Sequence, residues 1–200
     1  MYLGGRALRK LLIEGNWTAR IKELGQPLRE MKHSEVEALI GPNSIDVTLG
    51  DVFKIPSVSG KVVLDPTSPS VNKDLCWTRT EGPLILQPQG FALGSVRESF
   101  NCNTPFKGDH YAQMYDGRST MGRIGIGSHV TAGFGDFGFC GAFTLEIVNH
   151  APYSVLLTPG MRIGQVYFVK VRSPFRYKGA YRMDEHATEP VEPVLGPDRF

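Results

Sequence analysis

The sequence predicts a mainly β fold, a sandwich or a barrel, with two short helices near the N-terminus. Short apolar segments recur between residues 44 and 171, and Gly, Pro, Asn and Asp separate them at short intervals. The 200-residue chain contains 23 glycines and 14 prolines, a content typical of chains that turn often. A hydrophobic fraction of 41% is enough for a core. These observations favour a β domain over a disordered chain or a βαβ fold.

Two helices are expected before the first strand. A helix over residues 5–14 is predicted because its leucines recur at helical spacing. A second helix over residues 33–40 is predicted because Ser34 and Glu37 have the spacing of a capping box. The sequence Gly-Pro-Asn at 41–43 then breaks the chain.

The strands begin with the segment SIDVTLG at 44–50, where apolar and polar residues alternate as in a half-buried strand. The apolar pattern ends near Ser173, and the tail beyond it is acidic and rich in proline. We therefore expect one domain over residues 1–175 and a mobile lid or tail over 176–200. The remaining expected strands are 61–64, 83–87, 91–97, 110–115, 123–131, 142–149, 153–157 and 163–171.

Charge and cysteine content exclude several classes of protein. A net charge of +2 gives no support for a surface that coats nucleic acid. No apolar run reaches the roughly 18–20 residues of a membrane span, and the charged N-terminus is unlike a signal peptide. Cys76, Cys102 and Cys140 form no CxxC pair, so neither a disulfide framework nor a zinc site is expected. A reducing, cytoplasmic setting is the simplest interpretation.

Two glycine-containing segments are candidate ligand sites. The segment GRSTMGR at 117–123 combines hydroxyls and arginines, which suit phosphate, although a solvated turn would have the same composition. The segment TAGFGDFGF at 131–139 surrounds one acid with glycines and aromatics. Glycines let a backbone approach a ligand and aromatics stack on bases, but a wide hairpin with phenylalanines in the core explains the pattern equally well.

Single polar residues give two further candidates. Glu146 lies inside an otherwise apolar strand, where it is either a proton carrier or a glutamate on the polar face of the sheet. Gln165 follows the tight turn Pro159-Gly160 and either contacts a ligand or satisfies neighbouring backbone. His129 has no second ligand at metal spacing. The zinc-dependent deaminase pattern HxE…PCxxC does not occur.

Taken together, these segments resemble the dCTP deaminase branch of the trimeric dUTPase-like superfamily, from about residue 5 to about residue 181. Arg123 and Glu146 also have the spacing found in that family. Each motif is weak alone, but all occur in the family's order and spacing. The segments that carry the resemblance are GPNSIDVTLGDVF, LQPQGFALGSVRESF, YDGRSTMGRIGI, TAGFGDFGFCGAFTLEIVN and PGMRIGQVYF.

The resemblance implies a distorted β-barrel or jelly roll that forms homotrimers with active sites between subunits. It also implies a reaction in which dCTP and water give dUTP and ammonia without zinc. Glu146 would be the general base that activates the water attacking C4 of cytosine. Arg123 and Ser119 would hold the water and the exocyclic nitrogen, and the backbone carbonyl of Ala132 would help to position it.

The resemblance further implies the substrate contacts. Mg²⁺ would be bound through the triphosphate, with no ligand from a protein side chain. Asp136 would bind the deoxyribose 3′-OH and Phe139 would line the sugar or base, while Thr144 and Leu145 would meet the base through their backbone. Gln165 would lie near the phosphates. The remaining positions are Arg118, Thr120, Met121 and Gly122 for the triphosphate, Tyr177 and Lys178 for the lid, and His129 and Thr131 for a loop that some members use in dTTP feedback.

The chain departs from the family pattern at two places. Phe137 stands where the family usually has Pro, and Gly135 replaces a usual aliphatic residue. A pocket for a modified cytosine is therefore conceivable. The C-terminal lid is short, and Ala180 occupies the position of its usual Gln.

Alternative activities follow from the same motifs. Asp136 occupies the place of the water-activating aspartate of dUTPases, and Gly122 with the TAGF loop resembles bifunctional members that convert dCTP to dUMP and pyrophosphate. A dUTPase without deaminase activity is a third possibility. A non-catalytic nucleotide-binding regulatory trimer would be expected to lack the general base, whereas Glu146 is present.

Overall fold

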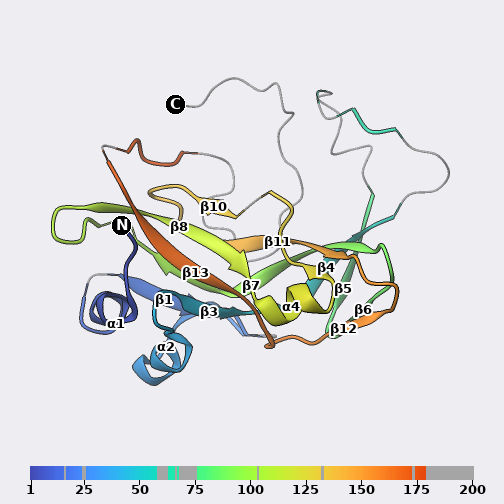
Figure 1. The fold of residues 1–200 in the computed structure, drawn as a ribbon, viewed down its shortest axis with the longest axis horizontal. Helices are drawn as coiled ribbons and strands as arrows, with labels where there is room; N and C mark the ends of the chain where they lie inside the picture. Colours follow the sequence, from blue (N-terminus) through green and yellow to red (C-terminus); the bar gives the residue numbers. More distant parts are fainter. Residues whose placement is uncertain are drawn as a thin grey trace.

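Two antiparallel β-sheets that pack against each other make up most of the protein (Figure 1). This computed structural model describes residues 1–15, 17–23, 26–57, 63–65, 67, 76–102, 104–131, 133–172 and 174–178. The mainly β prediction is confirmed. No helix in these ranges is both long and apolar enough to cross a membrane.

The larger sheet has the strand order β2-β1-β7-β11-β9, and β4 joins it by pairing with β7 and with β5. The smaller sheet has the order β10-β8-β13-β3, and β6 pairs with β12 in a separate ribbon. The larger sheet comprises β1 (Thr18–Ile21), β2 (Arg29–Glu30), β4 (Val52–Pro56), β5 (Trp77–Glu81), β7 (Phe91–Asn101), β9 (Ile126–Gly127) and β11 (Ala142–Asn149). The others are β3 (Ile45–Thr48), β8 (His110–Gly117), β10 (Phe134–Gly135), β13 (Arg162–Val171), β6 (Leu84–Leu86) and β12 (Val155–Leu157).

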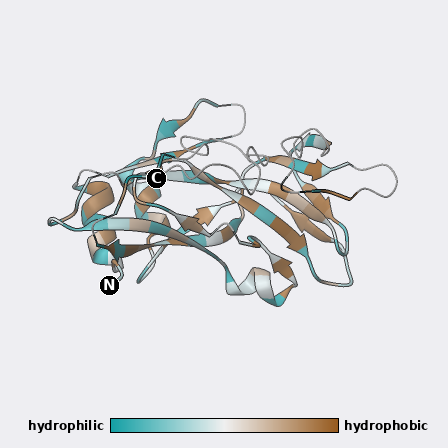
Figure 2. Cartoon of the chain, turned by 90° about the horizontal axis from the view of Figure 1, so that it is seen from above, coloured by the Kyte–Doolittle hydropathy of each residue, from teal (hydrophilic) through white to brown (hydrophobic). Residues whose placement is uncertain are grey.

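The core lies between the two sheets. Phe100 on β7 meets Phe168 on β13 edge to face, with ring centroids 6.0 Å apart, and both side chains are buried. Tyr115 on β8 similarly contacts Phe143 on β11 at 5.9 Å. Figure 2 shows hydrophobic residues recurring along the strands among polar ones, as period-2 alternation requires. Burial of such aromatic side chains is the main favourable contribution to folding, at about 1.5–3 kcal/mol for each.

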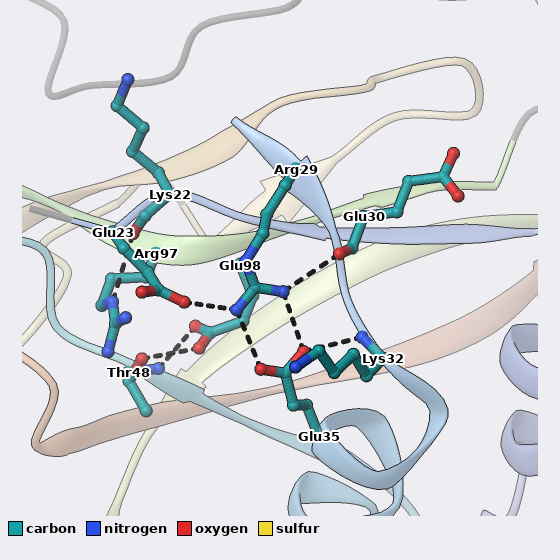
Figure 3. Close-up of polar contacts among 9 residues, drawn as sticks. All are labelled: Lys22, Glu23, Arg29, Glu30, Lys32, Glu35, Thr48, Arg97 and Glu98. Atoms are coloured by element: carbon teal, nitrogen blue, oxygen red, sulfur yellow. Dashed lines mark hydrogen bonds and ion pairs between the residues drawn. The ribbon is translucent and has the colours of Figure 1, made fainter. Parts of the chain in front are cut away.

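Among the described residues, the helices that accompany the sheets are α1 (Gly5–Ile13), α2 (His33–Leu39) and α4 (Ser119–Arg123). The first two confirm the predicted helices, but the predicted capping box at Ser34 and Glu37 is wrong. The N-cap residue is Lys32, two residues before Ser34, and the Glu35 side chain accepts a 2.7 Å hydrogen bond from the Lys32 N–H. The Glu35 side chain also accepts hydrogen bonds from the Arg29 guanidinium, which is hydrogen-bonded to Glu23 as well (Figure 3). The bonds from Arg29 and from the Lys32 N–H lower the pKa of the Glu35 carboxyl to about 2.

A buried carboxyl group links the two sheets. Glu98 on β7 accepts hydrogen bonds from the backbone N–H of Thr48, at 2.7 Å, and from its hydroxyl, at 2.6 Å (Figure 3). Glu98 is only 1% exposed, and this burial raises the pKa of its carboxyl group. The bond fixes the end of β3, the strand that carries Asp46.

Most predicted strands are present, but the prediction for 123–131 is wrong and the described part of 61–64 is not a strand. The prediction for 142–149 matches β11, whereas 123–131 contains the end of α4 and a β9 of only two residues. The reason is Gly125, whose φ of +81° turns the chain and whose Cβ, if present, would lie 2.7 Å from that of Ala151. Of the predicted strand 61–64, residues 61 and 62 lie outside the described residues and 63–64 are not in a strand. The described part of the expected tail ends at Lys178.

Candidate active site

Glu146 lies on β11 among buried neighbours and is itself half-buried. Its Oε2 atom accepts hydrogen bonds from the backbone N–H groups of Val130 and Thr131, each at 2.8 Å. These are charge-assisted bonds, which are stronger than bonds between neutral groups. Glu146 is therefore held by a loop rather than left free on the polar face of the sheet.

The hydroxyl-rich segment forms α4, a single helical turn. Met121 is buried and anchors the helix, while Ser119, Thr120 and Gly122 are exposed. The Arg123 guanidinium donates a 3.4 Å hydrogen bond to the Ser119 hydroxyl, since residues four apart share one face of a helix.

Arg118, the N-cap residue of α4, belongs to a cluster of charged side chains. Its guanidinium lies 2.6 Å from a carboxylate oxygen of Asp46 on β3, and Arg162 on β13 lies 2.9 Å from the same oxygen. Two cations share one carboxylate, so these three groups together carry a positive charge. Such an arrangement suits an anion such as phosphate.

Gln165 joins the same region of the sheet. It is paired with Asp46 across β3 and β13, and its Oε1 atom accepts a 3.0 Å hydrogen bond from the Ser44 hydroxyl. The structure thus brings the predicted phosphate residues Arg118 and Gln165 to one place. It adds Asp46 and Arg162, which the sequence did not single out.

A turn carries the predicted sugar and base residues. The Phe139 N–H donates to the Asp136 carbonyl at 2.9 Å, and Gly138 has a φ of +92°, as in a type II turn. Asp136 is exposed, and Phe139 is half-buried. The Phe139 ring lies 5.4 Å from that of Phe143 and 6.0 Å from that of Tyr177, measured between centroids.

The remaining residues predicted to bind substrate lie on β11 and in the segment after β13. Thr144 is half-buried and Leu145 fully buried on β11, directly before Glu146. The Tyr177 N–H donates to the Phe137 carbonyl at 2.8 Å, so the chain after β13 returns to the turn. Lys178 is exposed at the end of the described residues.

The loop before β10 contains the predicted regulatory residues. The His129 ring contacts Tyr115 edge to face at 5.5 Å, and its Nε2 atom lies 3.8 Å from a carboxylate oxygen of Asp116. Its Nδ1 atom is buried and has no hydrogen-bond partner among the described residues. The backbone N–H of Thr131 donates to the Glu146 carboxylate. Ala132 lies outside the described residues.

The predicted catalytic residues belong to two hydrogen-bonded groups, Ser119 with Arg123 and Glu146 with the loop before β10. Across the described ranges, no hydrogen bond or ion pair joins Glu146 to Arg123 or Ser119. An open groove of about 780 Å³ lies elsewhere, beside the start of α1, and none of the predicted site residues lines it. Within the part of the chain that the structure describes, no three His, Cys, Asp or Glu side chains are grouped to hold a metal ion.

Chemically, this site offers a carboxylate for proton transfer and arginines with hydroxyls for an anion. The comparisons with known proteins agree with that chemistry. A family model described as dCTP deaminase-like matches residues 13–171. A Dictyoglomus thermophilum protein named "dCTP deaminase, dUMP-forming" is 36% identical over 176 residues, or 87% of this chain and 82% of that protein. A Mycobacterium leprae protein of the same name is 37% identical over 139 residues, or 69% of this chain and 70% of that protein.

Among solved structures, the chain is similar to the 2′-deoxycytidine 5′-triphosphate deaminase from Agrobacterium tumefaciens, with a TM-score of 0.55 and 16% identity. The match covers 84% of this chain and 47% of that one, so it spans about half of the other chain. At this identity the likeness shows the fold alone. The family model and the relatives together establish that this chain belongs to the dCTP deaminase-like family.

Proposed function

We propose that this protein deaminates dCTP hydrolytically, with dUTP and ammonia as the products of that step. The observation that carries the proposal is the Glu146 carboxylate, which two backbone N–H groups hold on β11, in a chain whose helix α4 presents arginine and hydroxyl groups. The names of relatives that are 36–37% identical support the same substrate.

In this proposal Glu146 removes a proton from water, and the water oxygen attacks C4 of the cytosine. Glu146 delivers this proton to N3 and then moves the remaining proton of the C4 hydroxyl to the amine, so that the C4–N4 bond breaks, one water is consumed and one ammonia is released. Arg123 and Ser119, already hydrogen-bonded to each other, hold the water and the exocyclic nitrogen together with the Ala132 carbonyl.

The triphosphate would bind to the hydroxyls and backbone of α4, with Arg118 as its main cation. Arg118 is paired with Asp46, which also contacts Arg162, so the anion would share guanidinium groups that one carboxylate leaves incompletely neutralised. Mg²⁺ would enter on the nucleotide, with phosphate oxygens and waters as its ligands.

A second candidate is conversion of dCTP to dUMP. The relatives are named "dUMP-forming", which favours hydrolysis of dUTP to dUMP and pyrophosphate after deamination. The exposed Asp136 carboxylate would activate the water for that step. Feedback by dTTP would act through the His129–Thr131 loop, because moving this loop would break the two hydrogen bonds to Glu146.

We also propose a homotrimer with shared active sites. Among the described residues, no hydrogen bond or ion pair joins Glu146 to Arg123 or Ser119, which supports a site completed by a second copy. Exposed apolar side chains support a covered surface: Ile85 and Leu156, opposite each other in the β6-β12 pair, are 59% and 58% exposed.

The substitution Glu146→Gln tests the role of the carboxylate. Glutamine keeps the size and an oxygen for the Val130 and Thr131 N–H groups, but it cannot carry the proton. We expect kcat for dCTP to fall by about 10²–10⁴-fold or more, while the dCTP dissociation constant stays within about threefold. Ammonia release measures kcat, and calorimetry measures the dCTP dissociation constant.

The matched control is Glu30→Gln on the edge strand β2, an exposed glutamate remote from the site, which should leave both quantities unchanged. Turnover retained by Glu146→Gln would rule out Glu146 as the general base.

A further inference from the structure

A buried glutamine on β8 contacts the turn that carries Asp136 and Phe139. Gln113 is 2% exposed, and its Nε2 atom donates to the carbonyl of Phe100 at 3.0 Å and to that of Phe139 at 3.1 Å. Because both partners can only accept, the nitrogen of the amide must face them. Gln113 therefore joins the end of β7 to the last residue of the turn.

The other end of the same amide is unsatisfied. The Oε1 atom of Gln113 is buried and has no hydrogen-bond partner among the described residues. An unpaired buried acceptor is unfavourable, and a leucine of similar size would avoid it. The glutamine is thus explained by its two donated bonds and not by packing alone.

The turn itself lacks its usual internal restraint. A type II turn favours proline at its second position, because proline fixes φ near the value that the turn needs. Phe137 stands there instead, and its ring packs edge to face on His110 of β8, with centroids 4.7 Å apart and planes at 84°. Two residues of β8, His110 and Gln113, thus hold the turn at Phe137 and at Phe139.

Gly135 provides the space for this arrangement. It is the register partner of Gln113 across β10 and β8. A Cβ atom at Gly135 would lie 3.0 Å from the Phe143 ring, 3.1 Å from the Phe139 ring and 3.4 Å from the Gln113 Cβ. The missing side chain lets the Phe139 ring and the Gln113 amide pack at the same point.

We propose that Gln113 is a positioning residue for nucleoside binding: it holds the Asp136–Phe139 turn from outside and so replaces the restraint of a proline. The inference rests on the proposed function, in which Asp136 contacts the sugar and Phe139 lines the sugar or base. The hydrogen bonds of Gln113 hold the turn that contacts the substrate and do not reach the reacting atoms. Their loss should therefore affect substrate binding rather than proton transfer.

The test is Gln113→Leu, with Gln113→Met as a second variant of similar volume that also lacks the donor. Of the two bonds that these variants remove, one reaches the turn, and the loss of one hydrogen bond is expected to raise KM for dCTP roughly five- to tenfold, with kcat within twofold. Hydrogen exchange of the Phe139 amide and its neighbours in the turn should become faster in the same variants.

A second substitution separates positioning from general destabilisation. Adding Phe137→Pro to Gln113→Leu should restore KM and slow exchange, because proline supplies the φ restraint at the second position of the turn. The control Ile21→Val, in the core on β1, should lower Tm but leave KM and exchange in the turn unchanged.

Unchanged KM and unchanged exchange in both Gln113 variants would overturn the proposal, as would a rise in KM that Phe137→Pro does not reverse. Different results would contradict the proposed deamination and the positioning role of Gln113. A wild-type protein that does not turn over dCTP contradicts the proposed function, while hydrogen exchange of the turn still decides whether Gln113 holds it.

Discussion

Glu98 is a fully buried carboxyl group on β7, and its ionisation makes stability depend on pH. Burial raises its pKa in the folded protein above the ordinary value of about 4.3. A group of this kind stabilises the fold fully below its unfolded pKa, and that stabilisation is lost as pH rises through the folded pKa. The two bonds from Thr48 limit the loss but do not reverse its sign.

We therefore expect Glu98→Gln to remove this pH dependence. Glutamine can still accept from the Thr48 N–H, and its amide nitrogen can donate to the Thr48 hydroxyl oxygen. The Tm of the wild type relative to Glu98→Gln should be highest near pH 4 and should fall as pH rises toward 8. Calorimetry across that range, with the exposed Glu30→Gln as control, measures the difference. A constant difference, or one that rises with pH, would contradict this assignment.

Residues of the candidate site differ in how well the sequence predicts them. Glu146 is predictable because a carboxylate inside an apolar strand needs a partner, and the structure provides two N–H groups. The role of Asp46 cannot be predicted from the sequence, because its partners Arg118 and Arg162 come from distant segments that only the folded sheet brings together. Gln113 is missed for the same reason, because its bonds reach Phe100 and Phe139 on two other segments.

At the scale of elements, apolar alternation predicts the buried strands well. In β11 buried residues alternate with half-buried ones from Phe143 onward, and the predicted bounds match because Phe143, Leu145 and Ile147 are large, apolar and buried. The strands that the sequence misses are short or weakly patterned. In β5, WTRTE, no residue is fully buried, so the period-2 signal is absent although β4 pairs along its whole length.

Local interactions also override apolar alternation. The sequence predicts a long strand over residues 123–131, but Ser119–Arg123 closes one helical turn and Gly125 redirects the chain. The same local structure places Ser119 and Arg123 on one face, which a strand would also have done but at greater separation. The common face of the two side chains therefore follows from their spacing, although the element that carries them was not predicted.

At the scale of the whole molecule, the proposed shared site requires association. Light scattering at assay concentration should give about 66 kDa, three times the chain mass of 22.1 kDa. A monomer that deaminates dCTP at full rate under the same conditions would show that one chain completes the site, and the trimer proposal would then fail.

The central claim is that this chain converts dCTP by hydrolytic deamination. The most direct measurement is a time course of dCTP with the purified protein and Mg²⁺, in which ion-exchange chromatography resolves every nucleotide and ammonia is measured in parallel. We predict loss of dCTP with one ammonia released per nucleotide, as dUTP for a deaminase alone or as dUMP and pyrophosphate for the bifunctional enzyme. Unchanged dCTP and no ammonia, in a sample whose Tm rises on adding dCTP, would contradict the account and leave a nucleotide-binding protein without this activity.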